Sequence, residues 1–262
     1  MNIKLITIIS LLVFSANATG QISSDINKTD QQGRKQGPWI KKYPNKNTMY
    51  EGIFKDDYPV GEFRRYYEDK TIKSIFIFSD DGKIADATIY HPNGFISARG
   101  KYINQLKEGK WKFFSFSVNG YLVCEEEYSK NIRDGQSLKF FQDSTVAEKI
   151  NFVNDIRQGE WLQYYPNGKT SLKSYYKDGL LNGKMEVWFE NGTIELSGFY
   201  KNNLREGHWH IYNEDGNLKY EMDYVAGTTK NRQFDIDASN LIDSLEKNSG
   251  KIADPEKSVE FR

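Results

Sequence analysis

Aromatic and apolar residues return along the chain at a fixed interval of 24 residues between Gly37 and Lys230. Counted from the small residue that opens each unit, position 6 and position 18 are almost always aromatic, and position 3 is most often tryptophan. Eight units fit this count, and they open at Gly37, Gly61, Ala85, Gly109, Gly135, Gly159, Gly183 and Gly207. The unit at Gly109 carries a two-residue insertion. So regular a repeat predicts units that all contact their neighbours in the same way.

Each unit has the pattern of a β-hairpin. Turn-forming pairs stand between two runs of aromatic and β-branched residues, as at Asn167-Gly168, Asn191-Gly192 and Asp215-Gly216. A second turn falls near positions 20 to 24. Because a single hairpin is marginally stable in water, we expect the hairpins to stack side by side. The predicted fold is all-β: an elongated single-layer antiparallel ribbon of about eight hairpin units.

Two rows of rings have different expected roles. The first row forms the predicted structural core between units: Trp39, Trp111, Trp161, Trp209, Tyr102, Tyr128, Tyr176, Tyr200 and Tyr224. The second row occupies position 7, beside the position 6 rings: Tyr43, Tyr67, His91, Phe141, Tyr165 and Phe189. Strand alternation puts positions 6 and 7 on opposite faces, so either a bulge turns both rows inward or an aromatic stripe is exposed. Position 16 predicts a close approach by a neighbouring group in three units, at Gly52, Gly100 and Gly198.

The two ends differ in composition from the repeats. Residues 1–20 combine Lys4, an apolar run and small residues at 16–18, which is the layout of a secretory signal peptide. Residues 21–36 form a polar lead that we expect to be flexible, and residues 37–230 form the repeat array. Residues 231–262 include a short helical pattern, with Asp237 or Ser239 as its N-cap. This segment caps the last edge of the sheet, docks a partner, or is disordered.

The balance of charge names no partner, because 36 basic residues stand against 36 acidic ones. No basic field favours nucleic acid, and no apolar run after the signal is long enough to span a bilayer. The expected location is therefore the periplasm or the extracellular space. Cys124 is the single cysteine, so no intramolecular disulfide can form. The acidic run Glu125–Glu127 disfavours its thiolate, and we expect a half-buried strand position for it.

No constellation of residues points to catalysis, a metal or a cofactor. His208 and His210 lie on one face of a predicted strand, but the sequence offers no third ligand, and sister units carry unrelated residues there. The glycines recur with the period of the repeat, so they mark turns and do not form a phosphate-binding loop. We expect a protein that is not an enzyme.

Unit by unit, the sequence resembles a known repeat family. The stretches from Gly159-Glu160-Trp161 to Gly168 and from Gly198-Phe199-Tyr200 to Gly207 resemble the MORN repeat in its bacterial variant form. The resemblance extends from about Gly37 to Lys230. It implies an elongated, gently twisted ribbon of antiparallel hairpins that mediates protein or membrane contacts, and it brings no catalytic residues with it.

Two functions of different classes fit these observations. The first is an exported, non-catalytic scaffold that binds another protein. The alternative is a glycan-binding surface, in which the position 7 rings stack on sugars. Exposure of that row distinguishes the two hypotheses. No basic stripe accompanies the rings, so a membrane surface is not favoured. The sequence leaves the oligomeric state open.

Overall fold

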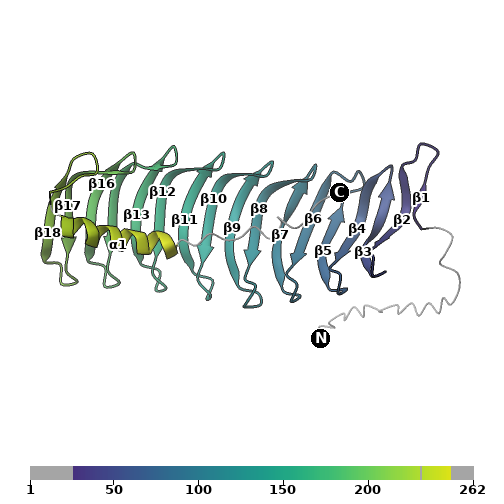
Figure 1. Cartoon of the computed structure of the whole chain (residues 1–262), viewed down its shortest axis with the longest axis horizontal. Helices are drawn as coiled ribbons and strands as arrows, with labels where there is room; N and C mark the ends of the chain where they lie inside the picture. Colours follow the sequence, from purple (N-terminus) through teal and green to yellow (C-terminus); the bar gives the residue numbers. More distant parts are fainter. Residues whose placement is uncertain (1–25, 231, 249–262) are drawn as a thin grey trace, which may run out of the picture.

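The computed structural model describes residues 26–230 and 232–248, which form one sheet and one helix (Figure 1). The predicted signal peptide and the last residues of the predicted tail lie outside the described residues. Eighteen strands make up the sheet. Their bounds are β1 Lys28–Thr29, β2 Lys35–Lys42, β3 Thr48–Lys55, β4 Tyr58–Tyr66, β5 Ile72–Phe78, β6 Ile84–Tyr90, β7 Ile96–Ile103, β8 Leu106–Phe114, β9 Leu122–Ser129, β10 Ile132–Phe140, β11 Val146–Val153, β12 Ile156–Tyr164, β13 Thr170–Lys177, β14 Leu180–Leu181, β15 Gly183–Trp188, β16 Ile194–Lys201, β17 Leu204–Tyr212 and β18 Leu218–Tyr224. The helix α1 spans Arg232–Asn248.

The strands pair in hairpin order, each antiparallel to the next along the chain, from β1 and β2 to β17 and β18. β13 pairs with both β14 and β15, because a short break at Asn182 divides the strand that follows β13 into these two pieces. The sheet is open, long and a single layer, as Figure 1 shows. The predicted fold class is therefore confirmed.

A β-bulge recurs in every hairpin between positions 5 and 6. The register shifts there in all eight units, for example between Gln163 and Tyr164 and between Val187 and Trp188. A second irregularity lies at the junctions between units, where the opening glycines have positive φ angles. Ala85 replaces one of these glycines, and the β5–β6 junction accordingly shows no register shift. The 24-residue glycine column therefore marks junctions that require a left-handed backbone.

One face of the sheet, here called the inner face, carries positions 3, 5, 14, 16 and 18 and holds both hydrophobic clusters. Glycine at position 16 makes room for the ring at position 3 of the next unit. A Cβ on Gly100 would lie 2.2 Å from Trp111, and one on Gly198 would lie 2.1 Å from Trp209. The predicted close approach is thus an aromatic ring that lies flat on the backbone of the preceding unit.

Seven of the nine predicted core rings are buried on this face: Trp111, Trp161, Trp209, Tyr102, Tyr176, Tyr200 and Tyr224. The other two are half-buried. Trp39 belongs to the first unit and has only the two-residue strand β1 on its outer side. Tyr128 lies in a unit junction where Ser137 takes the place of tryptophan, so less ring surface covers it.

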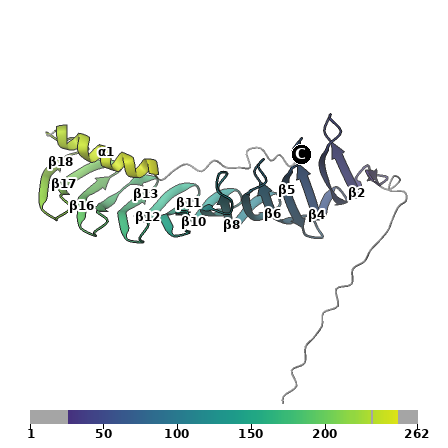
Figure 2. The same cartoon turned by 90° about the horizontal axis from the view of Figure 1, so that it is seen from below.

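The helix α1 lies along the inner face, over strands β12 to β18, as Figure 2 shows. Phe234, Ala238 and Ile242 are buried against the sheet, and Leu241 and Leu245 pack at the border. These residues recur every three or four positions, which places them on one side of the helix. The predicted N-cap is wrong, because the helix already begins at Arg232. One expectation was that this segment caps the last edge of the sheet. The helix instead covers the inner face of the last units.

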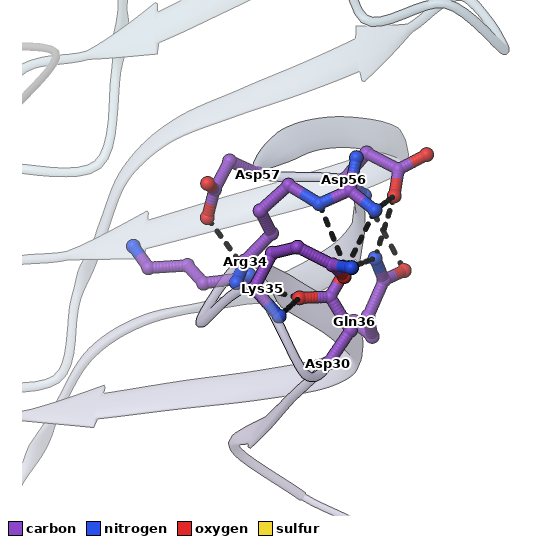
Figure 3. A network of polar contacts seen from close by, with 7 residues as sticks. Asp30, Arg34, Lys35, Gln36, Asp56 and Asp57 are labelled. Atoms are coloured by element: carbon purple, nitrogen blue, oxygen red, sulfur yellow. Dashed lines mark hydrogen bonds and ion pairs between the residues drawn. The ribbon is translucent and has the colours of Figure 1, made fainter.

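The sheet begins before the predicted boundary at Gly37. Within the expected flexible lead, β1 pairs with the start of β2, Lys28 opposite Gln36 and Thr29 opposite Lys35. Figure 3 shows the polar network that closes this turn. The Asp30 carboxylate accepts hydrogen bonds from the Gln32 and Arg34 amides, both at 2.9 Å. The Arg34 guanidinium contacts Asp30 at 2.7 Å and Asp56, in the turn after β3, at 3.0 Å.

Candidate functional site

The position 7 row lies at the hairpin turns and connects neighbouring units. All six of its residues are half-buried. Tyrosine hydroxyls in this row donate to the backbone carbonyl at position 6 of the next unit: Tyr43 to Tyr66 at 2.8 Å, Tyr67 to Tyr90 at 2.8 Å and Tyr165 to Trp188 at 2.5 Å. His91 Nε2 stands 3.2 Å from the Phe114 carbonyl in the same arrangement.

Burial raises the pKa of Tyr67 and of Tyr165, which fits hydroxyls that serve as structural donors. The row is neither fully exposed nor fully buried, and its polar atoms are engaged within the sheet. This geometry favours a role in joining units. The glycan hypothesis stays a prediction with no structural observation in its favour.

The candidate metal and thiol chemistry is not assembled. Among residues 26–230 and 232–248, no three His, Cys, Asp or Glu side chains are grouped for a metal ion. His208 Nδ1 lies 2.5 Å from Asp223, whereas the ring of His210 stacks on Tyr212. Cys124 is only 1% exposed, and burial, followed by the charge of Glu126, raises its pKa well above the usual range. The thiol is therefore fully buried and unreactive, beyond the half-buried state that was expected.

A row of cations at position 23 lies on the inner face, and the sequence interpretation missed it. Each cation stacks on rings of the next unit. Lys107 lies 5.1 Å from the Trp111 centroid, Arg133 lies 4.1 Å from Phe152, Arg157 lies 5.2 Å from Tyr176 and Arg205 lies 5.4 Å from Tyr224. Partly desolvated cation–π contacts of this kind stabilise by about 0.5–2 kcal/mol each. The available signal was a basic residue two places before the opening glycine.

At the last cation of this row, the helix supplies an acid. Arg205 donates to Asp235 of α1 at 2.6 Å, to the Ser239 hydroxyl at 3.1 Å and to the Tyr224 hydroxyl at 3.0 Å. Burial, together with the hydrogen bond to Asp235, raises the pKa of Tyr224 to about 12. Within its own chain, this inner face thus binds the apolar side of α1 and the carboxylate of Asp235.

A buried polar cluster marks the far end of the helix footprint. Glu148 accepts from Lys139 at 2.7 Å, from Trp161 at 3.3 Å and from Gln163 at 3.1 Å. Gln163 also donates to the Leu245 carbonyl near the end of α1, at 3.0 Å. The cluster satisfies a helix carbonyl and positions that end of the helix over β12.

Beyond this cluster, the inner face from β2 to β10 continues without a covering element among the described residues, as Figure 2 shows. The same rows of rings run through it, with Tyr102, Trp111 and Phe113 packed in a second cluster. Lys107 and Arg133 occupy the position that Arg205 has under the helix; Lys107 is 4% exposed, and Arg133 pairs with Asp155 at 2.9 Å. The uncovered face therefore has the chemistry of the covered one, and it is the candidate site.

These features define an open ribbon of β-hairpin repeats with a non-polar and cationic inner face. Comparison with protein families matches the MORN repeat variant to residues 157–178, 181–202 and 205–226. Residues 157–226 thus consist of three MORN repeats of the variant type, and the five earlier units share their hairpin and bulge. No curated protein matches the chain significantly. In the part of the chain described, α1 is neither long nor apolar enough to cross a bilayer.

Proposed function

We propose that the chain is an exported, non-catalytic scaffold that binds another protein on the uncovered inner face between β2 and β10. MORN repeats are binding modules, and their repeated hairpins supply surface without a reaction centre. The observation that carries the proposal is α1 itself. It occupies the inner face of the last units, whereas no described element covers the equivalent rows of the earlier units.

The contacts of α1 indicate what kind of segment fits. The helix places apolar side chains every three or four residues on the rings, and it places one carboxylate on a stacked cation. An amphipathic segment of a partner, with an acidic residue that replaces Asp155 as the partner of Arg133, would repeat these contacts. Rings and stacked cations of this type are enriched where protein interfaces bind most strongly.

Export rests on residues 1–20, whose charged start, apolar core and small residues fit a signal peptide. Mass spectrometry of the chain recovered from the periplasm or the medium tests this part. We expect the first residue to follow Ala18 or Gly20. Recovery of uncleaved chain in the cytoplasm alone would contradict export. It would leave the proposal for the binding face unaffected.

Binding is tested by reversing a charge on each face of the sheet. Arg133→Glu changes the inner face, and Lys101→Glu changes an exposed side chain on the opposite face. Both variants are compared with the unaltered chain in capture of proteins from envelope extract, after circular dichroism has shown the same fold. Loss of a captured protein with Arg133→Glu alone supports the proposal. Equal capture by all three chains contradicts it, and retention on a glycan array would favour the alternative.

A further inference from the structure

The two ends of the sheet are finished differently, and the N-terminal end is blocked. Asn27 lies against the outer edge of β2, where its amide donates to the Pro38 carbonyl at 2.8 Å. Its side chain accepts from the Ile40 amide at 2.8 Å and donates to the Ile40 carbonyl at 3.0 Å. The side chain thus replaces a peptide group of a neighbouring strand. Pro38 itself has no amide hydrogen to offer.

Further along the same edge, β1 pairs with Lys35 and Gln36, and the network of Figure 3 holds that turn closed. Gln36 joins this network by donating to Asp56 at 2.8 Å. An incoming strand would have to displace Asn27 and β1 together. Edge strands in soluble proteins are commonly protected in this way against pairing with other chains.

The C-terminal edge has no such protection among the described residues. β18 pairs with β17 on one side, and no described strand pairs with its other side. At position 14, Leu172 and Leu196 of interior units are 0% exposed, but Tyr220 is 39% exposed. Leu218 is 49% exposed. The difference arises because the units of Leu172 and Leu196 have a following neighbour, whereas no described strand follows β18.

The helix supports this edge from the inner face and leaves it accessible. The Phe234 ring meets Tyr220 edge-on, with centroids 6.1 Å apart, and also contacts Tyr224. β18 is therefore held in its strand conformation although one side is open. A preformed strand loses less conformational entropy on pairing than a flexible one.

We propose that two copies of the chain associate tail to tail, through antiparallel pairing of β18 with β18 of the second copy. The strand is complementary to itself in charge. Pairing centred on Tyr220 sets Lys219 of each copy opposite Glu221 of the other, whereas pairing centred on Glu221 sets the two Glu221 carboxylates opposite each other and is disfavoured. We therefore expect the register centred on Tyr220, in which the one cation of the strand meets an acid.

The blocked edge decides the form of the assembly. A strand partner that joined β18 to β2 of the next copy would build an open fibre, but Asn27 and β1 occupy β2. Pairing between two identical edges instead closes on a twofold axis and stops at a dimer. The result is one continuous sheet of twice the length, with an uncovered inner face near each end.

Cysteine cross-linking tests the contact and its register. Residues directly opposite in antiparallel strands have Cβ atoms about 4.5–5.5 Å apart, near the range of a disulfide. Tyr220→Cys, at the expected twofold axis, is expected to give a disulfide-linked dimer under mild oxidation. Lys41→Cys on β2 is the matched control and should remain monomeric. The native Cys124 does not compete, because it is buried.

Sedimentation velocity of the full chain without oxidant supplies the second readout. We expect a species of twice the 30.4 kDa chain mass at high concentration. Lys219→Glu places acids opposite acids and should raise the dimer dissociation constant about tenfold, with an unchanged melting temperature. Adding Glu221→Lys and Asp223→Lys to Lys219→Glu should restore the dimer. A chain that stays monomeric, or cross-links equally well through β2, overturns the proposal.

Discussion

Packing of a ring on a glycine of the preceding unit can be tested by one added methyl group. In Gly198→Ala the new Cβ would lie 2.1 Å from Trp209 Cδ2, 2.3 Å from Cε2 and 2.4 Å from Cε3. Carbon atoms in contact are normally about 3.5–4.0 Å apart, so the ring would have to move by about 1.4 Å. Trp209 cannot move freely, because the rings of Tyr200 and Tyr224 lie 5.1 Å and 5.9 Å from it.

Overpacking of a filled site costs about 1–3 kcal/mol. Alanine also restricts the unfolded chain more than glycine, which offsets about 0.4–1 kcal/mol of that loss. We therefore expect Gly198→Ala to lower the free energy of unfolding by about 1–2 kcal/mol. Urea unfolding followed by tryptophan fluorescence measures this change, and hydrogen exchange locates it in β16 and β17.

The chain contains a matched control at the same position of another unit. Ser174 occupies position 16, where it pairs with Trp161, and its buried hydroxyl has no hydrogen-bond partner. Ser174→Ala adds no atom and removes an unsatisfied group, so we expect no loss of stability. If Gly198→Ala were as stable as Ser174→Ala, the close approach of ring and backbone would not determine how the units fit together.

Three other substitutions test separate contacts. Arg205→Ala removes the partner of Asp235 and should destabilise α1 by about 1–3 kcal/mol, seen as faster hydrogen exchange at 234–242 than in the control Lys201→Ala. Tyr165→Phe removes one hydrogen bond between units and should lower the free energy of unfolding by about 0.5–1.5 kcal/mol. The loss should be the same when Tyr165→Phe is introduced into an outer-face variant such as Lys101→Glu. Tyr224 has a folded pKa of about 12, above its unfolded value near 10, so its contribution to stability is complete below pH 10 and is lost as pH rises towards 12. Tyr224→Phe should remove that part of the alkaline decline, and an unchanged decline would contradict the burial of this hydroxyl.

Much of the fold could be predicted because the repeat imposes it. The column of tryptophans and tyrosines identified the inner face, and Gly100 and Gly198 correctly indicated close contacts. The position 7 row could not be resolved from alternation alone, because a bulge at positions 5 and 6 changes which way neighbouring residues point. Only the pairing partners of a strand reveal such a bulge.

The position 23 cations were missed for a different reason. Lys107 and Arg205 are buried by rings that belong to the next unit, whereas polarity along the sequence predicts exposure. The start of α1 was misplaced because Asp237 and Ser239 both favour an N-cap, and the contact of Phe234 with Tyr224 extends the helix towards its N-terminus. Contacts between distant segments outweighed local preference in both cases.

Site-specific photo-cross-linking tests the central claim, that the uncovered inner face binds a protein, most directly. A photoreactive phenylalanine analogue is introduced in place of Arg133, or in place of Lys101 as the outer-face control, in cells that make the chain. We expect irradiation to give one discrete protein adduct from position 133 and none from position 101. Adducts from position 101 alone, or none from either position, would contradict the account.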